Sequence, residues 1–158
     1  MHAIALLRSM HADARTQFKL ILGTSPPTAA ADAWAALQPV LDLHEEIEDR
    51  FVYGPVRDEA GPGTLLGDWA VQHDADVEMI KHHIEQVAQF GTGTPAWQMA
   101  IAASFELLSK HVLVEENEIF GRIEQLWGAK RLAQVGKEME AMVTKAKRTQ
   151  RPAQAARA

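Results

Sequence analysis

Apolar residues recur at intervals of three and four over four long stretches of the chain, which is the period of an α-helix with one buried face. Gly- and Pro-rich runs separate these stretches, and no stretch shows the apolar–polar alternation of a strand. A shorter periodic stretch follows a break at Gly121 or Gly128. The pattern predicts helices over residues 3–22, 29–53, 64–90 and 132–149, and a further helix that begins at Pro95 and runs to that break.

Short connections between the four long helices indicate an all-α fold, an antiparallel up-down-up-down four-helix bundle with an additional C-terminal helix. Pro39 lies inside the second helix and predicts either a kink or a later helix start. The run from Gly54 to Gly63 is expected to be a loop. The 158 residues suit one domain, expected over 1–150, with a flexible tail at 151–158.

Four histidines and two glutamates interrupt the apolar faces of these helices. His44 and Glu48 lie one turn apart on one face, and His111 and Glu115 repeat the same spacing. A carboxylate on a buried face is costly unless a partner neutralises it. The residues concerned are His11, His44, Glu48, His73, His111 and Glu115.

The expected hairpins place the four histidines near one level of the bundle. His44 and His73 lie equally far from the loop between their helices, and His73 and His111 nearly so. His11 and His44 differ by four residues, about 6 Å along a helix. The region of Pro39 could absorb this offset.

Four imidazoles and two carboxylates at one level form a ligand set for two metal ions. His11 and His44 would flank one ion, His73 and His111 the other, with the two glutamates between them. Such ligands suit iron, manganese or zinc, and the absence of cysteine excludes thiolate and iron–sulfur ligation. Open positions on the metals would admit O2, peroxide or NO. A lone core histidine is more often merely hydrogen-bonded. This explains poorly four inward histidines, two of them with a glutamate one turn later.

The remaining titratable residues are expected to face solvent. His82 and His83 lie off the apolar face, and His2 lies near the N-terminus. Glu116 is expected on a solvated face, and would replace Glu115 at the site if its helix were slightly rotated.

Charge and hydropathy exclude several classes of partner. The net charge is −5, and the basic residues that gather after Ala129 suit the solvated end of a last helix, where cations favour the helix dipole. No apolar run approaches the roughly 20 residues that span a bilayer. We therefore expect no nucleic acid, no membrane and a cytoplasmic location.

These residues resemble the hemerythrin-like, or HHE cation-binding, family of non-haem di-iron four-helix bundles. The resemblance spans Leu6 to Phe120 and rests on His11, on HEEIEDRFVYGP from His44, on His73 in QHDADVEMI and on HVLVEENEIF from His111. It implies two iron ions, oxo- or hydroxo-bridged, held by the six residues. Within the family, the chain looks most like the hemerythrin-like proteins of actinobacteria.

Two positions depart from the oxygen-carrying hemerythrins that this chain resembles. Those proteins have a second histidine one turn after the third-helix histidine, where this chain has Val77. Their last ligand pair is His with Asp five residues later, whereas Glu115 follows His111 by four residues and Glu116 by five. The missing histidine argues against reversible oxygen carriage by the familiar mechanism.

Tyr53 is the only tyrosine and a candidate catalytic residue. In an ideal helix its side chain is rotated well away from Glu48, which favours an aromatic plug at the helix end. If Gly54 and Pro55 unwind the helix, the phenol could turn inward. It would then ligate the iron that lacks a histidine or donate a hydrogen bond to bound peroxide.

The resemblance implies a di-iron protein that binds and reacts with O2 or H2O2, with catalase-like peroxide decomposition as a possible enzymatic activity, or that binds NO. The alternatives are an O2- or NO-binding sensor or redox-response protein without turnover, and a metal-storage bundle. The partner expected for the di-iron protein is a small diatomic or peroxide ligand.

Overall fold

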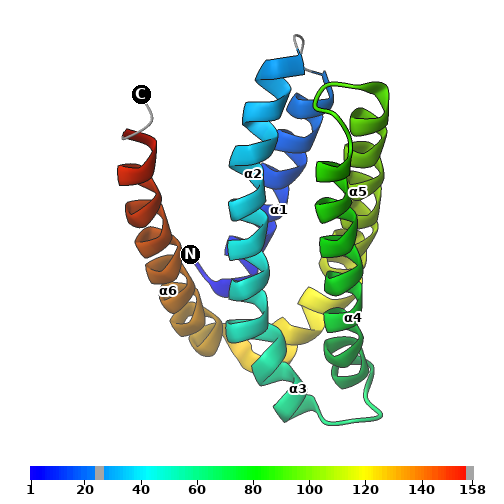
Figure 1. The fold of residues 1–158 in the computed structure, drawn as a ribbon. Coiled ribbons are helices and arrows are strands. Elements are labelled where there is room, and N and C mark those ends of the chain that lie inside the picture. The colour runs from blue at the N-terminus through cyan, green and yellow to red at the C-terminus, as the bar shows by residue number, and fades with distance from the viewer. Residues whose placement is uncertain (24–26, 156–158) are drawn as a thin grey trace.

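The computed structural model describes residues 1–23 and 27–155, and over these ranges the chain is helical throughout, with short connections (Figure 1). Four long helices form the bundle: α1 (Ala3–Gly23), α2 (Pro27–Glu48), α4 (Leu65–Gln86) and α5 (Pro95–Val114). Shorter segments continue three of them: the π turns η1 (Asp49–Tyr53) and η3 (Glu115–Ile119), the helix α3 (Gly54–Ala60) and the 3-10 turn η2 (Val87–Gln89). The long helix α6 (Phe120–Ala155) follows η3. The predicted all-α bundle with an added C-terminal helix is confirmed.

Two helix starts show the local chemistry that fixes the hairpins. Thr64 and Thr94 lie directly before α4 and α5, and each side-chain oxygen accepts a hydrogen bond from a backbone N–H three residues later. Such caps satisfy donors that the first helical turn leaves unpaired. Gly67, in the first turn of α4, passes so close to Gly61 that no larger residue fits there.

Two sequence-based expectations about breaks were wrong, and a third was confirmed. Residues 54–60 of the expected loop form α3, because Pro55 stands in the first turn, where its missing N–H costs nothing. Pro39 neither delays nor breaks α2. The break expected at Gly121 or Gly128 falls at Gly128, whose φ of 65° is left-handed, and Gly121 lies within α6. Of the predicted tail, 151–155 continue the backbone of α6, and 156–158 lie outside the described residues.

The part of α6 after Gly128 crosses back over the open side of the bundle (Figure 1). Leu132 and Met139 bury their side chains against the bundle. Glu59 of α3 accepts hydrogen bonds from the Arg131 guanidinium and from Trp127 Nε1, the latter at 3.1 Å. These contacts fix the direction of α6 after the break. No helix in the described part of the chain is long and apolar enough to cross a membrane.

The apolar core is divided into two clusters along the bundle axis. One contains Leu7 and Ile47, and the other contains Ala14 and Leu41. His11 and His44 lie between these pairs in sequence, and both are buried. The polar residues therefore form a layer between two apolar clusters, which shield it from water at both ends.

Candidate metal centre

All six predicted site residues point into this polar layer, and each is between 0% and 7% exposed. One comes from α1, two from α2, one from α4, one from α5 and one from the first position of η3. Burial of six ionisable groups together is costly unless charge is compensated within the layer.

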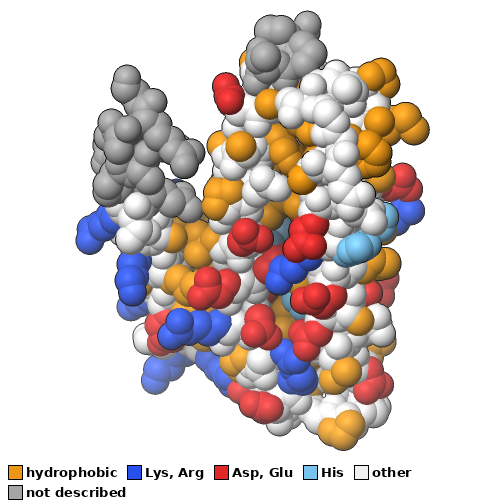
Figure 2. All heavy atoms as spheres, in the orientation of Figure 1, with side chains coloured by type: hydrophobic (Ala, Val, Ile, Leu, Met, Phe, Trp, Pro, Cys, Tyr) orange, Lys and Arg blue, Asp and Glu red, His pale blue; other side chains and the backbone are white. Residues whose placement is uncertain are grey.

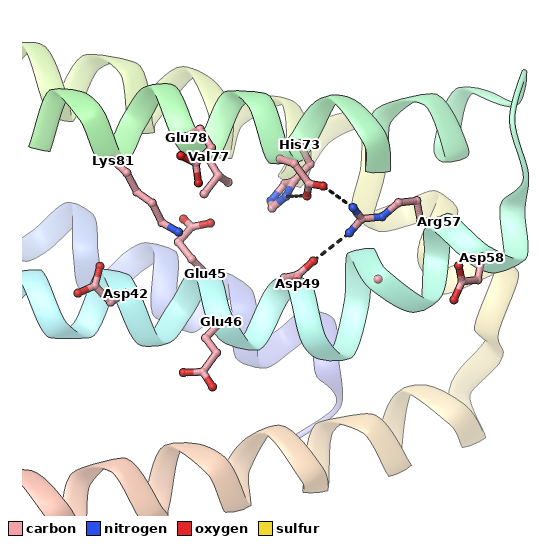
Figure 3. Close-up of a pocket in the computed structure, with 12 residues that line it drawn as sticks. Asp42, Glu45, Glu46, Asp49, Arg57, Asp58, His73, Val77, Glu78 and Lys81 are labelled. Atoms are coloured by element: carbon pink, nitrogen blue, oxygen red, sulfur yellow. Dashed lines mark hydrogen bonds and ion pairs between the residues drawn. The ribbon is translucent and has the colours of Figure 1, made fainter.

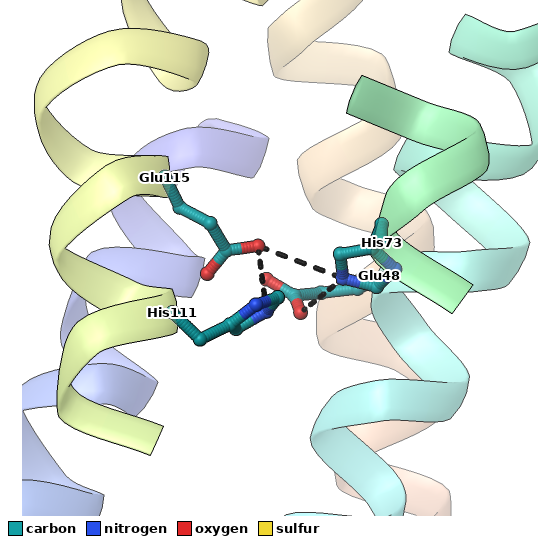
Figure 4. A group of neighbouring side chains, drawn as sticks. All are labelled: Glu48, His73, His111 and Glu115. Carbon is teal, nitrogen blue, oxygen red and sulfur yellow. Dashed lines mark ion pairs between the residues drawn. The ribbon is translucent and has the colours of Figure 1, made fainter. Parts of the chain in front are cut away.

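Four of the six form the first group: Glu48, His73, His111 and Glu115 (Figure 4). One ligand atom from each lies within 4.8 Å of all the others. His73 Nε2 is 3.6 Å from a carboxylate oxygen of Glu48 and 3.6 Å from Glu115 Oε1. His111 Nε2 is 3.4 Å from Glu115 Oε1. These separations leave space for one ion between four donors.

The second group consists of His11, His44 and Glu48. The two Nε2 atoms of His11 and His44 are 3.1 Å apart, and His44 Nε2 is 3.3 Å from Glu48 Oε2. His11 Nε2 also lies 3.4 Å from Glu115 Oε2. Glu48 thus belongs to both groups and Glu115 faces both, as expected for carboxylates placed between two ions.

Many side-chain nitrogen and oxygen atoms in this layer have no hydrogen-bond partner within the described part of the chain. They include both ring nitrogens of His73 and of His111 and both oxygens of Glu48. A buried polar atom without a partner costs about 1–3 kcal/mol, so native structures rarely leave several together. Metal ions would satisfy nitrogen and oxygen donors alike, so the donor set fits divalent cations.

The charges in the layer compensate one another. Burial would lower the pKa of His44, but the Glu48 carboxylate and the contact with it raise that pKa to about 9. Burial acts likewise on His111, and the contact with Glu115 and its charge raise its pKa to about 9. Burial would raise the pKa of Glu48, but the positive charge of His44 and the nearby rings of His11 and His73 hold it well below the ordinary value. Protonated imidazoles therefore neutralise carboxylates where metal ions would otherwise do so.

Each glutamate of the site adjoins a π turn, with η1 directly after Glu48 and η3 beginning at Glu115. A π turn is closed by hydrogen bonds between residues five apart, so residue i+5 lies closer to the direction of residue i than it does in an α-helix. Tyr53 follows Glu48 by five and consequently points inward, with 0% exposure. The inward phenol arises from this π turn and not from unwinding at Gly54 and Pro55, which are helical.

The Tyr53 hydroxyl donates a 2.6 Å hydrogen bond to Glu115 Oε1, the oxygen that also faces His73 and His111. Its ring stacks on His73 with centroids 3.9 Å apart. Burial raises the pKa of Tyr53 well above its ordinary value, and the carboxylates of Glu115 and Glu48 add to this effect. The metal-free centre therefore holds a neutral phenol at the edge of the first group.

Glu116 has a role that the sequence did not indicate. It was expected on a solvated face, or as a replacement for Glu115, but its Oε1 lies 3.0 Å from His11 Nδ1 and its side chain is only 19% exposed. Arg15 binds the same oxygen at 3.3 Å, and Arg8 donates to the Glu116 backbone carbonyl at 2.9 Å. Burial would raise the pKa of Glu116, but these bonds lower it. The carboxylate therefore orients the His11 ring through its outer nitrogen.

The other histidines stay outside both groups. His2 and His82 are exposed as expected, whereas His83 is half-buried at the surface of α4. His82 Nε2 pairs with the Gln86 amide at 2.9 Å, one turn along the same helix. None of the three approaches the polar layer.

The family model for the hemerythrin HHE cation binding domain matches residues 2–123. The chain belongs to this family. The matched range ends shortly before the break at Gly128 and contains all six residues of the polar layer and Tyr53. No curated protein and no solved structure matches the chain significantly. The protein is therefore a cation-binding HHE-domain bundle with a buried cluster of His and Glu side chains.

Proposed function

We propose that this hemerythrin-family bundle holds two iron ions and decomposes peroxide. The observation that carries the proposal is the pair of donor groups that share Glu48, with ring nitrogens and carboxylate oxygens left without partners inside the bundle. His11 and His44 would hold one ion, and His73 and His111 the other. Glu48 and Glu115 would contact both.

The donor chemistry supports iron. Mixed imidazole and carboxylate ligands suit iron, and the chain has no cysteine for structural zinc. Two iron ions, when bound, would supply the two electrons that peroxide decomposition exchanges. The protein's own contribution is a shaped layer with fixed donors, since the two apolar clusters exclude bulk water from both ends of it.

Val77 leaves room for a small molecule beside the first group. It follows His73 by one turn and is 7% exposed. It lines a cleft of about 780 Å³ between α2 and α4 that reaches His73, and a smaller cavity of about 170 Å³ beside Leu41 and Leu108. A histidine here would project into this space. An uncharged peroxide would reach the His73 side of the layer by this route.

Tyr53 is proposed to act on the same side of the centre. Its oxygen lies against Glu115 Oε1, which faces His73 and His111. As a phenol it would donate a hydrogen bond to a bound peroxide. As a phenolate it would occupy the ligand position that Val77 leaves vacant, and its negative charge would favour the ferric state. A visible charge-transfer band distinguishes the phenolate from the phenol.

A second candidate is O2 or NO binding without turnover. A nearly closed cavity of about 20 Å³ lies beside His11 and His44, lined mainly by apolar side chains such as Leu41 and Val112. This space fits about one water-sized molecule. Such a pocket favours a neutral diatomic ligand at the second group and would suit a sensor.

Elemental analysis of the reconstituted protein, with its absorption spectrum and O2 release from added H2O2, tests the proposal. We expect about two irons per chain and O2 release, and both should fall in His111→Ala. His83→Ala is the matched control, because His83 lies outside both groups. One metal or none per chain would contradict the di-iron centre. Two irons without O2 release would favour the sensor.

A further inference from the structure

An acidic cleft separates α2 from α4 and leads inward to His73 (Figure 3). Its volume is about 780 Å³. Acidic side chains gather over this face of the molecule (Figure 2). Seven carboxylates line the cleft against two cationic side chains, Arg57 and Lys81. The carboxylates belong to Asp42, Glu45, Glu46, Asp49, Asp58, Asp74 and Glu78.

The inner end of the cleft is His73, whose nearest carboxylate oxygens lie 3.6–4.0 Å from its ring nitrogens, beyond hydrogen-bond distance. His73 lines the cleft, yet it is only 2% exposed, and neither of its ring nitrogens has a hydrogen-bond partner. Its Nε2 belongs to the first donor group. Glu45 Oε2 is likewise buried without a partner and lies on the opposite wall. The cleft therefore connects solvent with His73, a residue of the polar layer whose ring nitrogens make no hydrogen bond.

The fixed cations leave one part of the cleft strongly negative. Arg57 binds both Asp49 and Asp74 and neutralises the end nearest α3 (Figure 3). In the described part of the chain, no lysine or arginine comes within ion-pair distance of Asp42 or Glu78. A cleft with excess charge of one sign focuses the field and raises the local concentration of counter-ions.

We propose that this cleft is the route by which hydrated divalent cations reach the centre, with His73 as the first donor that a cation meets after the carboxylates. The inference rests on the proposed metal centre. Carboxylate oxygens hold hydrated cations while these keep part of their water. On the opposite side of the centre, Glu116 and the guanidinium of Arg15 lie next to His11, and the guanidinium repels cations.

Rapid mixing of the metal-free protein with Co²⁺, followed through the visible bands of bound Co²⁺, tests this route. Asp42→Asn combined with Glu78→Gln removes two rim charges and leaves the donor groups intact. At about 10 mM salt, this double variant should take up Co²⁺ roughly tenfold more slowly than the wild-type protein. At about 0.5 M salt, where charges are screened, the two rates should be closer. Lys81→Gln removes a cation from the wall and should accelerate loading.

Asp32→Asn combined with Glu138→Gln is the matched control, because both residues are exposed, lie outside the cleft and change the net charge equally. The control should load at the wild-type rate, and all variants should reach the same final Co²⁺ content. Equal rates in the rim variant and the control would overturn the route while the centre stands. Absence of Co²⁺ binding in the wild-type protein would instead refute the centre.

Discussion

Replacing Tyr53 by Phe removes one oxygen atom from the polar layer and keeps the aromatic ring on His73. The lost oxygen donates a 2.6 Å hydrogen bond to Glu115 Oε1 in a site with 0% exposure. A hydrogen bond to a charged group contributes about 1.5–3 kcal/mol, and the full burial of Tyr53 keeps water from replacing the lost donor. The free energy of unfolding of the metal-free protein should fall by about that amount. For a domain of this length, the midpoint temperature should fall by roughly 3–12 °C.

Urea unfolding of chelator-treated protein measures this change. Ser104→Ala is the control, since it also deletes a buried hydroxyl, but one that donates only to the Ala100 carbonyl of its own helix at 2.9 Å. Its cost should stay under about 1 kcal/mol. If Tyr53→Phe costs no more than Ser104→Ala, the phenol does not stabilise Glu115.

In the iron-loaded protein, Tyr53→Phe should keep most of its iron, lose any phenolate band and change the rate of peroxide turnover. An unchanged spectrum and rate would leave Tyr53 with a packing role.

Three further predictions concern other parts of the chain. His44→Ala should lower the amount of bound metal, and it should cost about 3 kcal/mol of metal-free stability because Glu48 stays buried with a weaker partner. His83→Ala should do neither, and metal analysis with urea unfolding measures both effects. Gly67→Ala should cost about 2 kcal/mol of stability or more, since its Cβ would lie 1.9 Å from a backbone oxygen. At Gly121 an added Cβ meets nothing within 4 Å, so Gly121→Ala should gain up to about 1 kcal/mol of stability. Equal melting temperatures of the two variants would contradict this. Bonds from Arg131 lower the pKa of Glu59 in the folded protein. Its contribution to stability, about 0.2–1 kcal/mol, is therefore full above the ordinary pKa of 4.5 and is lost as pH falls through the lower folded pKa. Glu59→Gln should flatten this part of the curve of stability against pH.

The bundle and the position of its polar layer could be predicted because helical periodicity carries both. A histidine or glutamate on an apolar face must point inward, and the i, i+4 spacing fixes the direction of His44 relative to Glu48. Loop positions then determine the level of each residue along the bundle. The structure accordingly brings all six together.

The remaining features depend on geometry that a fixed helical period does not contain. Tyr53 and Glu116 both lie in or beside π turns, where the direction of each side chain departs from the 3.6-residue period. The bond from Glu116 to His11 also joins residues 105 positions apart, so no local pattern indicates it. The helices continue through two of the expected break positions for a simpler reason: Gly and Pro permit a break but do not require one, as Pro39 and Gly121 show.

The two π turns have a consequence for comparing this chain with others. A π turn forms when a helix takes up one extra residue without breaking, so residues after Tyr53 and after Ile119 are one position out of step with an uninterrupted α-helix. An alignment with a chain that lacks such a turn needs a one-residue gap there. Deleting one residue from 49–53 would let the helix close into regular α geometry and turn position 53 away from Glu115. The length of these short segments, as much as their composition, therefore determines which side chains face the metal centre.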